Sequence, residues 1–523
     1  MKVLLVNPGD TAATAATAVA FYGTTDASRS LMPNLALPTL AAMVPPGVEV
    51  ATRDEQLGPL DFDEPCDAVC ITGYANHRFR MPEVAAEFRR RGRLVVMGGP
   101  LVSLDPDWFR PHADVLVVGE AERTWPAFLA DLAAGAWRAE YRETGPVDLM
   151  ASPVPDYGVL RNDAYLVGVV QTSRGCPFQC EFCDVIVYLG RKQRHKTPAR
   201  VVEELEEVYR HGYRMVFLAD DNFTAYRRKA EAIVRAIAAW NATKRDRVSL
   251  LTQVSIDVAR DPDLLALAAD AGLALAFIGI ETPNPAALRE ARKNQNLQRD
   301  LVDDVYAFYR AGVAVQAGMI VGFDSDTRDI FRTQYEFLQR AGIATVGLAI
   351  LNAPEGTPLR ARMARAGRLI DPRLVPDFAT NLRPVCMSLE ELVEGARWLV
   401  NKLYAPSAFL ARLERMASLL PDRAPRRDAV VDAQAAGRGI AVIEALMRDF
   451  AALGAEYRGI VPRAVRLLRT KPVGILPLVL TQYRQVVASG RRRGVLDPAL
   501  AALDAPDFAR ARRGVPVRAV ASG

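Results

Sequence analysis

Three cysteines lie close together near the middle of the chain, at positions suited to a metal centre. Cys176, Cys180 and Cys183 have the spacing C-x3-C-x2-C and follow the apolar run 165–170. Three soft thiolates on one loop favour zinc or an iron–sulfur centre. A closed zinc site needs a fourth ligand, which only a distant residue such as His195 would supply. An iron–sulfur cubane fits better, because three cysteines leave one iron open to a ligand that is not protein.

The surroundings of these cysteines resemble the signature of the radical S-adenosylmethionine (SAM) superfamily. Residues 172–184 read T-S-R-G-C-P-F-Q-C-E-F-C-D, with the aromatic Phe182 directly before the last cysteine. The resemblance implies a [4Fe-4S] cluster on Cys176, Cys180 and Cys183, whose open iron binds the amino and carboxylate groups of SAM. The alternatives are a zinc site and three unrelated buried thiols.

The stretch after the cysteines repeats a helix-then-strand pattern. Glycines at 212, 272, 312 and 342 end amphipathic helices and are followed by apolar strands, while Thr197-Pro198 and Asp261-Pro262 mark helix starts. Strands near 165, 214, 248, 274, 313 and 345 give six βα units, three-quarters of a TIM barrel. Radical SAM cores have such a partial barrel, so pattern and resemblance agree.

Polar residues follow these strands where a barrel carries its functional groups. The resemblance implies that residues 220–222 accept the SAM amino group, that Glu281 contacts SAM, and that residues 321–323 lie along the adenine. Ser255 and Asp257 suit ribose hydroxyls. A carboxylate at a strand end is also a common helix cap, so each assignment alone is weak. The SAM-binding set is Phe182, Asp220, Asp221, Asn222, Ser255, Asp257, Glu281, Val321, Gly322 and Phe323.

The first part of the chain alternates apolar strands with amphipathic helices. Strands are expected at 2–7, 48–53, 68–72, 93–97 and 114–118, with the clearest helices at 81–91 and 124–134. This pattern predicts an α/β fold with a doubly wound, Rossmann-like sheet, whose ligands bind beyond the carboxyl ends of the strands. No G-x-G-x-x-G follows the first strand, so a nicotinamide site is not expected.

This half resembles the cobalamin-binding domain at the amino terminus of one radical SAM class. The common cobalamin motif D-x-H-x-x-G supplies a histidine to cobalt, but here Asp54-Glu-Gln-Leu-Gly58 has Gln56 in its place. The resemblance then implies cobalt bound without that histidine. Whether Asn76, His77 or Arg78 faces the metal is open; the alternatives are a solvent-facing His77, and another ligand or none for the domain. The implied cobalamin-binding set is Gln56, Thr72, Gly73, Tyr74, Asn76, His77, Gly98, Gly99, Pro100, Gly119 and Glu120.

Length and composition set the remaining expectations. The chain has 523 residues and a net charge of +5, which predicts several domains and no nucleic-acid partner. No signal peptide is evident, and no apolar run reaches the ~18 residues of a spanning helix. Cys66, Cys70 and Cys386 are expected to be buried thiols. A labile cluster needs a reducing compartment, so the cytoplasm is expected.

The predicted organisation is a cobalamin-binding domain at 1–137, a linker at 138–163, a radical SAM partial barrel at 164–372 and a helical C-terminal domain at 373–523. The tail combines apolar runs with arginines at 463, 466, 469, 484 and 491–493. Such a pattern suits either contact with a membrane surface or a helical cap with a solvated basic side.

Over nearly the whole chain, the sequence resembles the class B cobalamin-dependent radical SAM methyltransferases, particularly the group with a helical extension that includes hopanoid C-2 methylases. Besides the cysteine run, the shared features are V-G-F-D-S-D at 321–326, the turn N-A-P-E-G-T at 352–357 and the basic tail. The resemblance implies methylation of an unactivated carbon of a small molecule or lipid, using a 5′-deoxyadenosyl radical, methylcobalamin and an external electron donor such as flavodoxin or ferredoxin. The alternatives are a cobalamin radical SAM cyclase or ring-rearrangement enzyme, and a cobalamin sensor with a structural cluster.

Overall fold

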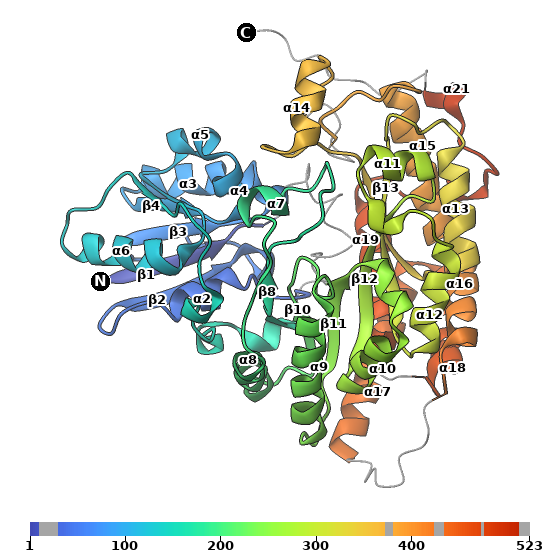
Figure 1. The fold of residues 1–523 in the computed structure, drawn as a ribbon, viewed down its shortest axis with the longest axis horizontal. Coiled ribbons are helices and arrows are strands. Elements are labelled where there is room, and N and C mark those ends of the chain that lie inside the picture. Colours follow the sequence, from blue (N-terminus) through green and yellow to red (C-terminus); the bar gives the residue numbers. More distant parts are fainter. Residues whose placement is uncertain (10–29, 372–379, 423–432, 472–474, 512–523) are drawn as a thin grey trace. The chain divides into compact units, whose positions relative to one another are not determined.

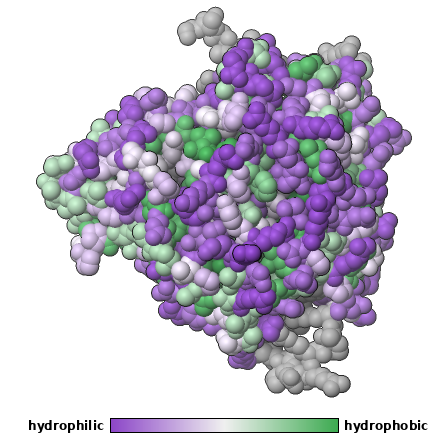
Figure 2. All heavy atoms as spheres, in the orientation of Figure 1, coloured by the Kyte–Doolittle hydropathy of each residue, from purple (hydrophilic) through white to green (hydrophobic). Residues whose placement is uncertain are grey.

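The computed structural model describes residues 1–9, 30–371, 380–422, 433–471 and 475–511. These fall into two compact units. Residues 1–9, 30–248 and 353–366 belong to the first unit, and the rest belong to the second. Within the described residues, no helix is long and apolar enough to cross a bilayer. On the face shown in Figure 2, hydrophilic residues predominate and the apolar ones lie in small separate groups.

The first unit contains a six-stranded parallel sheet in the order β2-β1-β3-β4-β5-β6. The four central strands, β1, β3, β4 and β5, read as near-continuous apolar runs because helices cover both faces. Met81, Val84 and Phe88 of α3 join a buried cluster with β1, β3 and β4, while Trp125 of α6 donates to Leu40 O of α2. Figure 1 shows α3, α4 and α5 on one side of this sheet and α2 and α6 on the other. The strands are β1 (Lys2–Asn7), β2 (Glu49–Asp54), β3 (Ala68–Thr72), β4 (Leu94–Gly98), β5 (Val115–Val118) and β6 (Glu140–Arg142), and the helices are α2 (Ala36–Ala41), α3 (Arg80–Arg90), α4 (Pro100–Leu104), α5 (Pro106–Phe109) and α6 (Ala121–Ala133).

The doubly wound sheet is thus confirmed, with one strand more than expected. β6 lies inside the segment that the sequence predicts as a linker, and it pairs with β5 through Leu116–Val118. Only Tyr141 of its three residues is buried. A strand this short carries no detectable period, so pairing with a neighbour, rather than local pattern, defines it.

The second sheet is also parallel, and its order is β14-β13-β12-β11-β10-β7. Its six strands lie close to the six expected positions, so the partial barrel is confirmed. β7 and β10 belong to the first unit, and β11 to β14 to the second. The strands are β7 (Gly168–Val170), β10 (Met215–Leu218), β11 (Ser249–Val254), β12 (Leu273–Glu281), β13 (Ala314–Val321) and β14 (Thr345–Ile350), and the helices among and after them are α8 (Pro198–Arg210), α9 (Arg227–Ala242), α10 (Pro262–Ala271), α11 (Pro285–Glu290), α12 (Leu301–Arg310), α13 (Ile330–Ala341) and α14 (Pro358–Arg365).

From residue 389 onward, the described part of the C-terminal segment consists of helices joined by short loops, as expected. Arg412 of α16, fully buried, donates to Ile343 O at 2.7 Å and to Leu403 O at 2.7 Å, and so ties α16 to the ends of α13 and α15. Burial lowers its pKa to about 10, which leaves the guanidinium charged at neutral pH. The helices are α15 (Leu389–Tyr404), α16 (Pro406–Leu419), α17 (Ala433–Leu453), α18 (Ile460–Leu468), α19 (Ile475–Arg492), α20 (Pro498–Ala502) and α21 (Phe508–Ala511).

Candidate active site around the cysteine loop

The cysteines lie on the loop that follows β7, behind the two-residue strand β8 (Ser173–Arg174). β8 pairs antiparallel with β9 (Arg194–His195), and the N–H of Cys176 donates to Gly190 O at 3.3 Å. Gly175 has φ +91°, and a Cβ there would lie 2.9 Å from Gly190 O. Only glycine allows this close approach of the two backbone segments. The turn is completed by the N–H of Cys183, which donates to Cys180 O at 3.1 Å.

Two aspartates at the end of β10 hold the residues that precede Cys176. Asp220 is 1% exposed, and its Oδ1 accepts the N–H groups of Thr172 at 2.7 Å and Ser173 at 2.6 Å. Its Oδ2 accepts the Thr172 hydroxyl at 2.5 Å. Asp221 accepts the N–H of Gly175 at 2.8 Å. Burial raises the pKa of both carboxyls to about 6, so both are mostly ionised at neutral pH.

The sequence predicts Asp220, Asp221 and Asn222 as acceptors for the SAM amino group. In this structure the Asp220 carboxylate bonds within the protein to the cysteine loop. We therefore assign Asp220 to positioning that loop, and its direct contact with SAM stays a prediction. Gln193, which sequence reasoning did not identify, adds a further brace by donating to Ser173 Oγ at 2.9 Å and Asn222 O at 2.8 Å.

Glu181, inside the cysteine motif, is a second residue that sequence reasoning missed. It is 7% exposed, and Arg362 of α14 donates to its two oxygens at 2.8 and 3.0 Å. The N–H of Leu359 donates to Glu181 O at 3.1 Å. α14 is thereby fastened to the loop between Cys180 and Phe182. A carboxylate between cysteines that are predicted to bind metal was the available signal, since a buried carboxylate needs a cationic partner.

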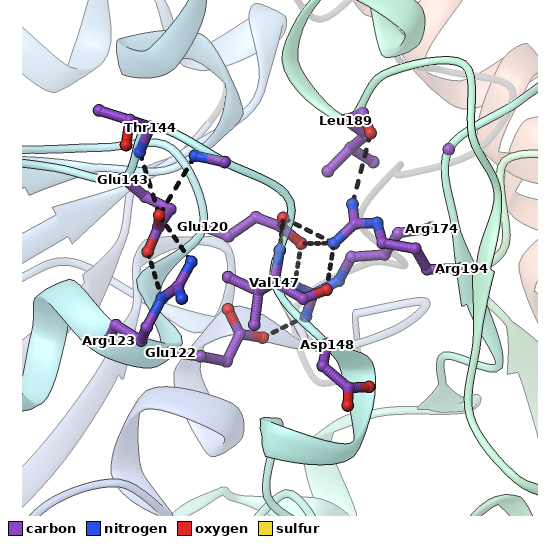
Figure 3. A network of polar contacts seen from close by, with 12 residues as sticks. Glu120, Glu122, Arg123, Glu143, Thr144, Val147, Asp148, Arg174, Leu189 and Arg194 are labelled. Carbon is purple, nitrogen blue, oxygen red and sulfur yellow. Dashed lines mark hydrogen bonds and ion pairs between the residues drawn. The ribbon is translucent and has the colours of Figure 1, made fainter.

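Arg174, two residues before Cys176, joins the cysteine loop to the end of β5. Its guanidinium contacts Glu120 at 2.7 Å and Glu122 at 2.7 Å. Arg194 also donates to Glu120, at 2.7 Å, and to Val147 O at 2.6 Å. Figure 3 shows both arginines converging on Glu120, with the more exposed pair Arg123–Glu143 beside them. Both carboxylate oxygens of Glu120, a predicted cobalamin contact, thus accept hydrogen bonds within this network.

The arrangement of the thiols bears on the kind of metal centre. Ligands of one zinc ion must converge within about 2.3 Å of a point. Among the residues that the structure describes, no three His, Cys, Asp or Glu side chains are placed to hold a single metal ion. Thiolates on three different irons of a cubane need no common point. Burial raises the pKa of the Cys176 and Cys183 thiols, so binding of metal must drive their ionisation.

The other residues predicted to bind SAM lie in the second unit. Glu281, at the end of β12, has φ +65° and pairs with Lys293 at 2.6 Å. A Cβ on Gly279 would lie 2.3 Å from Glu281 Oε1 and 2.7 Å from Lys293 Nζ, so this ion pair packs directly against the backbone of Gly279 in β12. A left-handed conformation at a buried glutamate stores strain of the kind found at functional sites. Ser255 directly follows β11, and Asp257 lies in the 3-10 helix Ile256–Arg260 that begins there.

The loop 321–323 is held by a buried carboxylate. Asp326 is 1% exposed and accepts the N–H groups of Gly322 at 2.9 Å and Phe323 at 3.1 Å. Asn284 donates to its other oxygen at 3.3 Å. The SAM-binding set is therefore divided between the two units, and its assembly into one site stays a prediction.

The predicted cobalamin contacts gather at the carboxyl edge of the first sheet. At three of the glycines in this set, nearby protein atoms already explain why no side chain fits. A Cβ on Gly73 would lie 2.8 Å from His77 Nδ1, one on Gly99 would lie 2.5 Å from Thr72 Oγ1, and one on Gly119 would lie 3.0 Å from a Glu143 atom. Small residues at this edge therefore do not by themselves indicate room for a ligand. Gln56 accepts the Ser30 hydroxyl at 3.1 Å.

The structure corrects two expectations. His77 is 1% exposed, so the solvent-facing alternative is wrong. Its Nδ1 accepts the N–H of Tyr74 at 3.1 Å and its Nε2 lies 2.9 Å from Asn76 Nδ2, because the loop folds back over its own backbone. Cys386 is exposed, not buried, because in the irregular loop before α15 it is the neighbouring Met387 that packs inward. Cys66 and Cys70 are buried as expected.

Comparison with known proteins places these features in a family. Residues 170–338 match the model of the radical SAM superfamily, and residues 357–458 match a domain of unknown function, DUF4070. The chain is 34% identical to an uncharacterised methyltransferase of Synechocystis sp., over 73% of this chain and 72% of the relative. It is 31% identical to the hopanoid C-2 methylase of Rhodopseudomonas palustris, over 75% of each.

Among solved structures, a cobalamin-dependent SAM radical enzyme, OxsB, with aqua-cobalamin and SAM bound, has a similar fold. It aligns with a TM-score of 0.61 at 13% identity, covering 98% of this chain and 82% of that one. The fold and the cysteine loop define a radical SAM enzyme. Together with the curated relatives, they show that the chain belongs to the methyltransferases of the radical SAM superfamily.

Proposed function

We propose that this protein methylates an unactivated carbon of a lipid or natural product. The observation that carries the proposal is the brace on the cysteine loop. Asp220 accepts hydrogen bonds from Thr172 and Ser173, and Asp221 accepts one from Gly175. Arg174 forms ion pairs with Glu120 and Glu122. A structural thiol cluster would not need such preorganisation, whereas a centre that must present one open iron to a ligand does.

Cys176, Cys180 and Cys183 would hold a [4Fe-4S] cluster, and the edge formed by Thr72, Gly98 and Gly119 would receive cobalamin. When bound, the cluster and SAM supply a 5′-deoxyadenosyl radical and cobalamin supplies the methyl group. The chain would orient these groups and exclude water, and the hydrogen atom removed from the substrate carbon would end on 5′-deoxyadenosine. Asp220 and Asp326 act by fixing loops, and Lys293 neutralises Glu281.

Three further elements of the proposal concern partners. A hopanoid is the first substrate to test, because a relative at 31% identity is a hopanoid C-2 methylase. An external one-electron donor such as flavodoxin or ferredoxin reduces the cluster in the cytoplasm, where such centres survive. The basic face of the C-terminal helices, with exposed Arg466 and Arg469, would suit the surface of an anionic membrane that carries a lipid substrate.

The test is anaerobic turnover of reconstituted protein with SAM, methylcobalamin, a chemical reductant and a hopanoid. We expect 5′-deoxyadenosine and a product heavier by one methylene. A product rearranged without gain of methyl would instead indicate a cyclase. The triple variant Cys176→Ala, Cys180→Ala, Cys183→Ala should lose all SAM cleavage, while a sensor with a structural cluster would cleave no SAM even as wild type.

A further inference from the structure

A group of exposed basic residues lies on the segments that flank the cysteine loop. Residues 188–196 and 222–230 contain seven lysines and arginines and no aspartate or glutamate. Two of the seven are used inside the protein, since Arg194 bonds to Glu120 and Lys196 bonds to Glu204. Arg191, Lys192, Arg228 and Lys229 are exposed, and we call these four residues the basic band.

One end of the basic band lies directly against the first cysteine. Gly190 O accepts the N–H of Cys176 at 3.3 Å, and Arg191 donates to Pro177 O at 3.2 Å. The following residues form β9, which is paired with β8 of the cysteine loop. A molecule that docks on Arg191 and Lys192 therefore lies on the outer side of the loop that would hold the cluster.

The other end of the band begins α9. His195 of β9 contacts the ring of Tyr226 edge-on, with centroids 5.8 Å apart, and Tyr226 is 45% exposed. Tyr226 is the residue before α9, whose first turn is Arg227, Arg228 and Lys229. Cations there oppose the positive end of the helix dipole, so helix stability does not explain them. Their placement concentrates positive potential beside an exposed aromatic ring.

We propose that the basic band is the docking surface for an acidic one-electron carrier protein of the flavodoxin type. This inference rests on the proposed function, in which each reduction takes one electron from outside the chain: the carrier is oxidised by one electron and the cluster is reduced by one. Complementary charge accelerates such encounters and sets their orientation. The contact of the band with the cysteine loop favours an electron carrier over a nucleic acid.

The test uses charge reversal in the full-length protein. Arg228→Glu/Lys229→Glu is the informative variant, because glutamates suit the first turn of α9 and so should not unfold it. Its matched control is Arg332→Glu/Arg340→Glu, two exposed arginines of α13 with the same change of charge. The measurement is the rate at which reduced flavodoxin reduces the reconstituted cluster at low salt, followed by stopped-flow absorbance. Dithionite serves as the small reductant, and binding of oxidised flavodoxin is followed by fluorescence anisotropy.

We expect flavodoxin to reduce the cluster of the α9 variant at least about tenfold more slowly than that of wild type. The rate in the variant should also depend less on salt concentration. Reduction of its cluster by dithionite should be as fast as in wild type. In the control variant, reduction by flavodoxin and by dithionite should both be as fast as in wild type. Adding Arg191→Glu/Lys192→Glu to the α9 variant should lower the rate of cluster reduction by flavodoxin further. An α9 variant whose cluster is reduced by flavodoxin at the wild-type rate overturns the proposal. If that variant also loses binding of a labelled RNA oligonucleotide, the basic band binds nucleic acid instead of the carrier.

The outcomes remain separable from those of the proposed function. Failure of dithionite-reduced protein to cleave SAM refutes the enzymatic proposal and leaves the docking surface to be judged from the binding of oxidised flavodoxin, which needs no turnover. Normal SAM cleavage with dithionite, together with equal flavodoxin affinity in wild type and the α9 variant, refutes the docking surface alone.

Discussion

Thr172 donates both its backbone N–H, at 2.7 Å, and its hydroxyl, at 2.5 Å, to the carboxylate of Asp220. The two residues follow β7 and β10, which are paired in parallel. Because parallel neighbours end at the same edge, the carboxylate after one strand reaches the loop after the other. The loop with the cysteines thus has its conformation fixed by the chain itself, and three predictions concern that loop and its partners.

Asp220→Asn should weaken the hold on the cysteine loop. An amide cannot accept all three of the hydrogen bonds, which leaves a buried donor without a partner and lowers the free energy of unfolding by about 1–3 kcal/mol. Reconstituted protein should lose iron to a chelator faster than wild type. Asp300→Asn is the control, because Asp300 also accepts two N–H groups but caps α12. Equal rates of iron loss in wild type and Asp220→Asn would refute this role.

Gly175→Ala and Gly190→Ala separate steric fit from backbone strain. Both glycines have positive φ, +91° and +80°, so each alanine is strained by about 1 kcal/mol. A Cβ at 175 meets Gly190 O at 2.9 Å, whereas a Cβ at 190 meets nothing within 4 Å. We expect Gly175→Ala to lose most of its iron after reconstitution and Gly190→Ala to retain it, as measured by iron content per chain. Similar iron content in the two variants would contradict the close packing of these segments.

Glu120→Gln tests the network of Figure 3. Removing this carboxylate leaves two largely buried guanidiniums, 13% and 12% exposed, with fewer partners, and the free energy of unfolding should fall by roughly 3 kcal/mol. Glu143→Gln is the matched control, since its partner Arg123 is 62% exposed and such pairs contribute less than about 1 kcal/mol. Denaturant unfolding of both variants gives the comparison. The prediction fails if the two losses are the same.

Asp326 should make stability depend on pH. Burial raises its pKa from 3.8 to about 6, so the folded state binds the proton more tightly than the unfolded state. The contribution of this group to the free energy of unfolding therefore falls as pH rises from about 4 to about 6, by on the order of 1 kcal/mol per pH unit, and is constant outside that window. The measurement is denaturant unfolding of wild type and Asp326→Asn from pH 4 to 8. The stability deficit of the variant should narrow as pH rises; a constant deficit would show that Asp326 does not titrate in this window.

The chain's local patterns were sufficient for the architecture. Apolar runs and the helix ends marked by glycine located both sheets and all the expected strands, because period and termination depend on neighbouring residues. β6 was missed because three residues have no period, and Cys386 was misjudged because burial in a loop depends on what packs over it.

The site divides in the same way. The spacing of Cys176, Cys180 and Cys183 is a local property, so the amino-acid sequence alone was enough to predict a metal centre there. The roles of Asp220, Glu120 and Glu181 depend on partners 48, 54 and 181 positions away, at Thr172, Arg174 and Arg362. Only the folded chain brings such groups together, and a buried carboxylate takes its role from the donors that surround it. The tertiary structure therefore decided which acidic residues hold the cysteine loop in place.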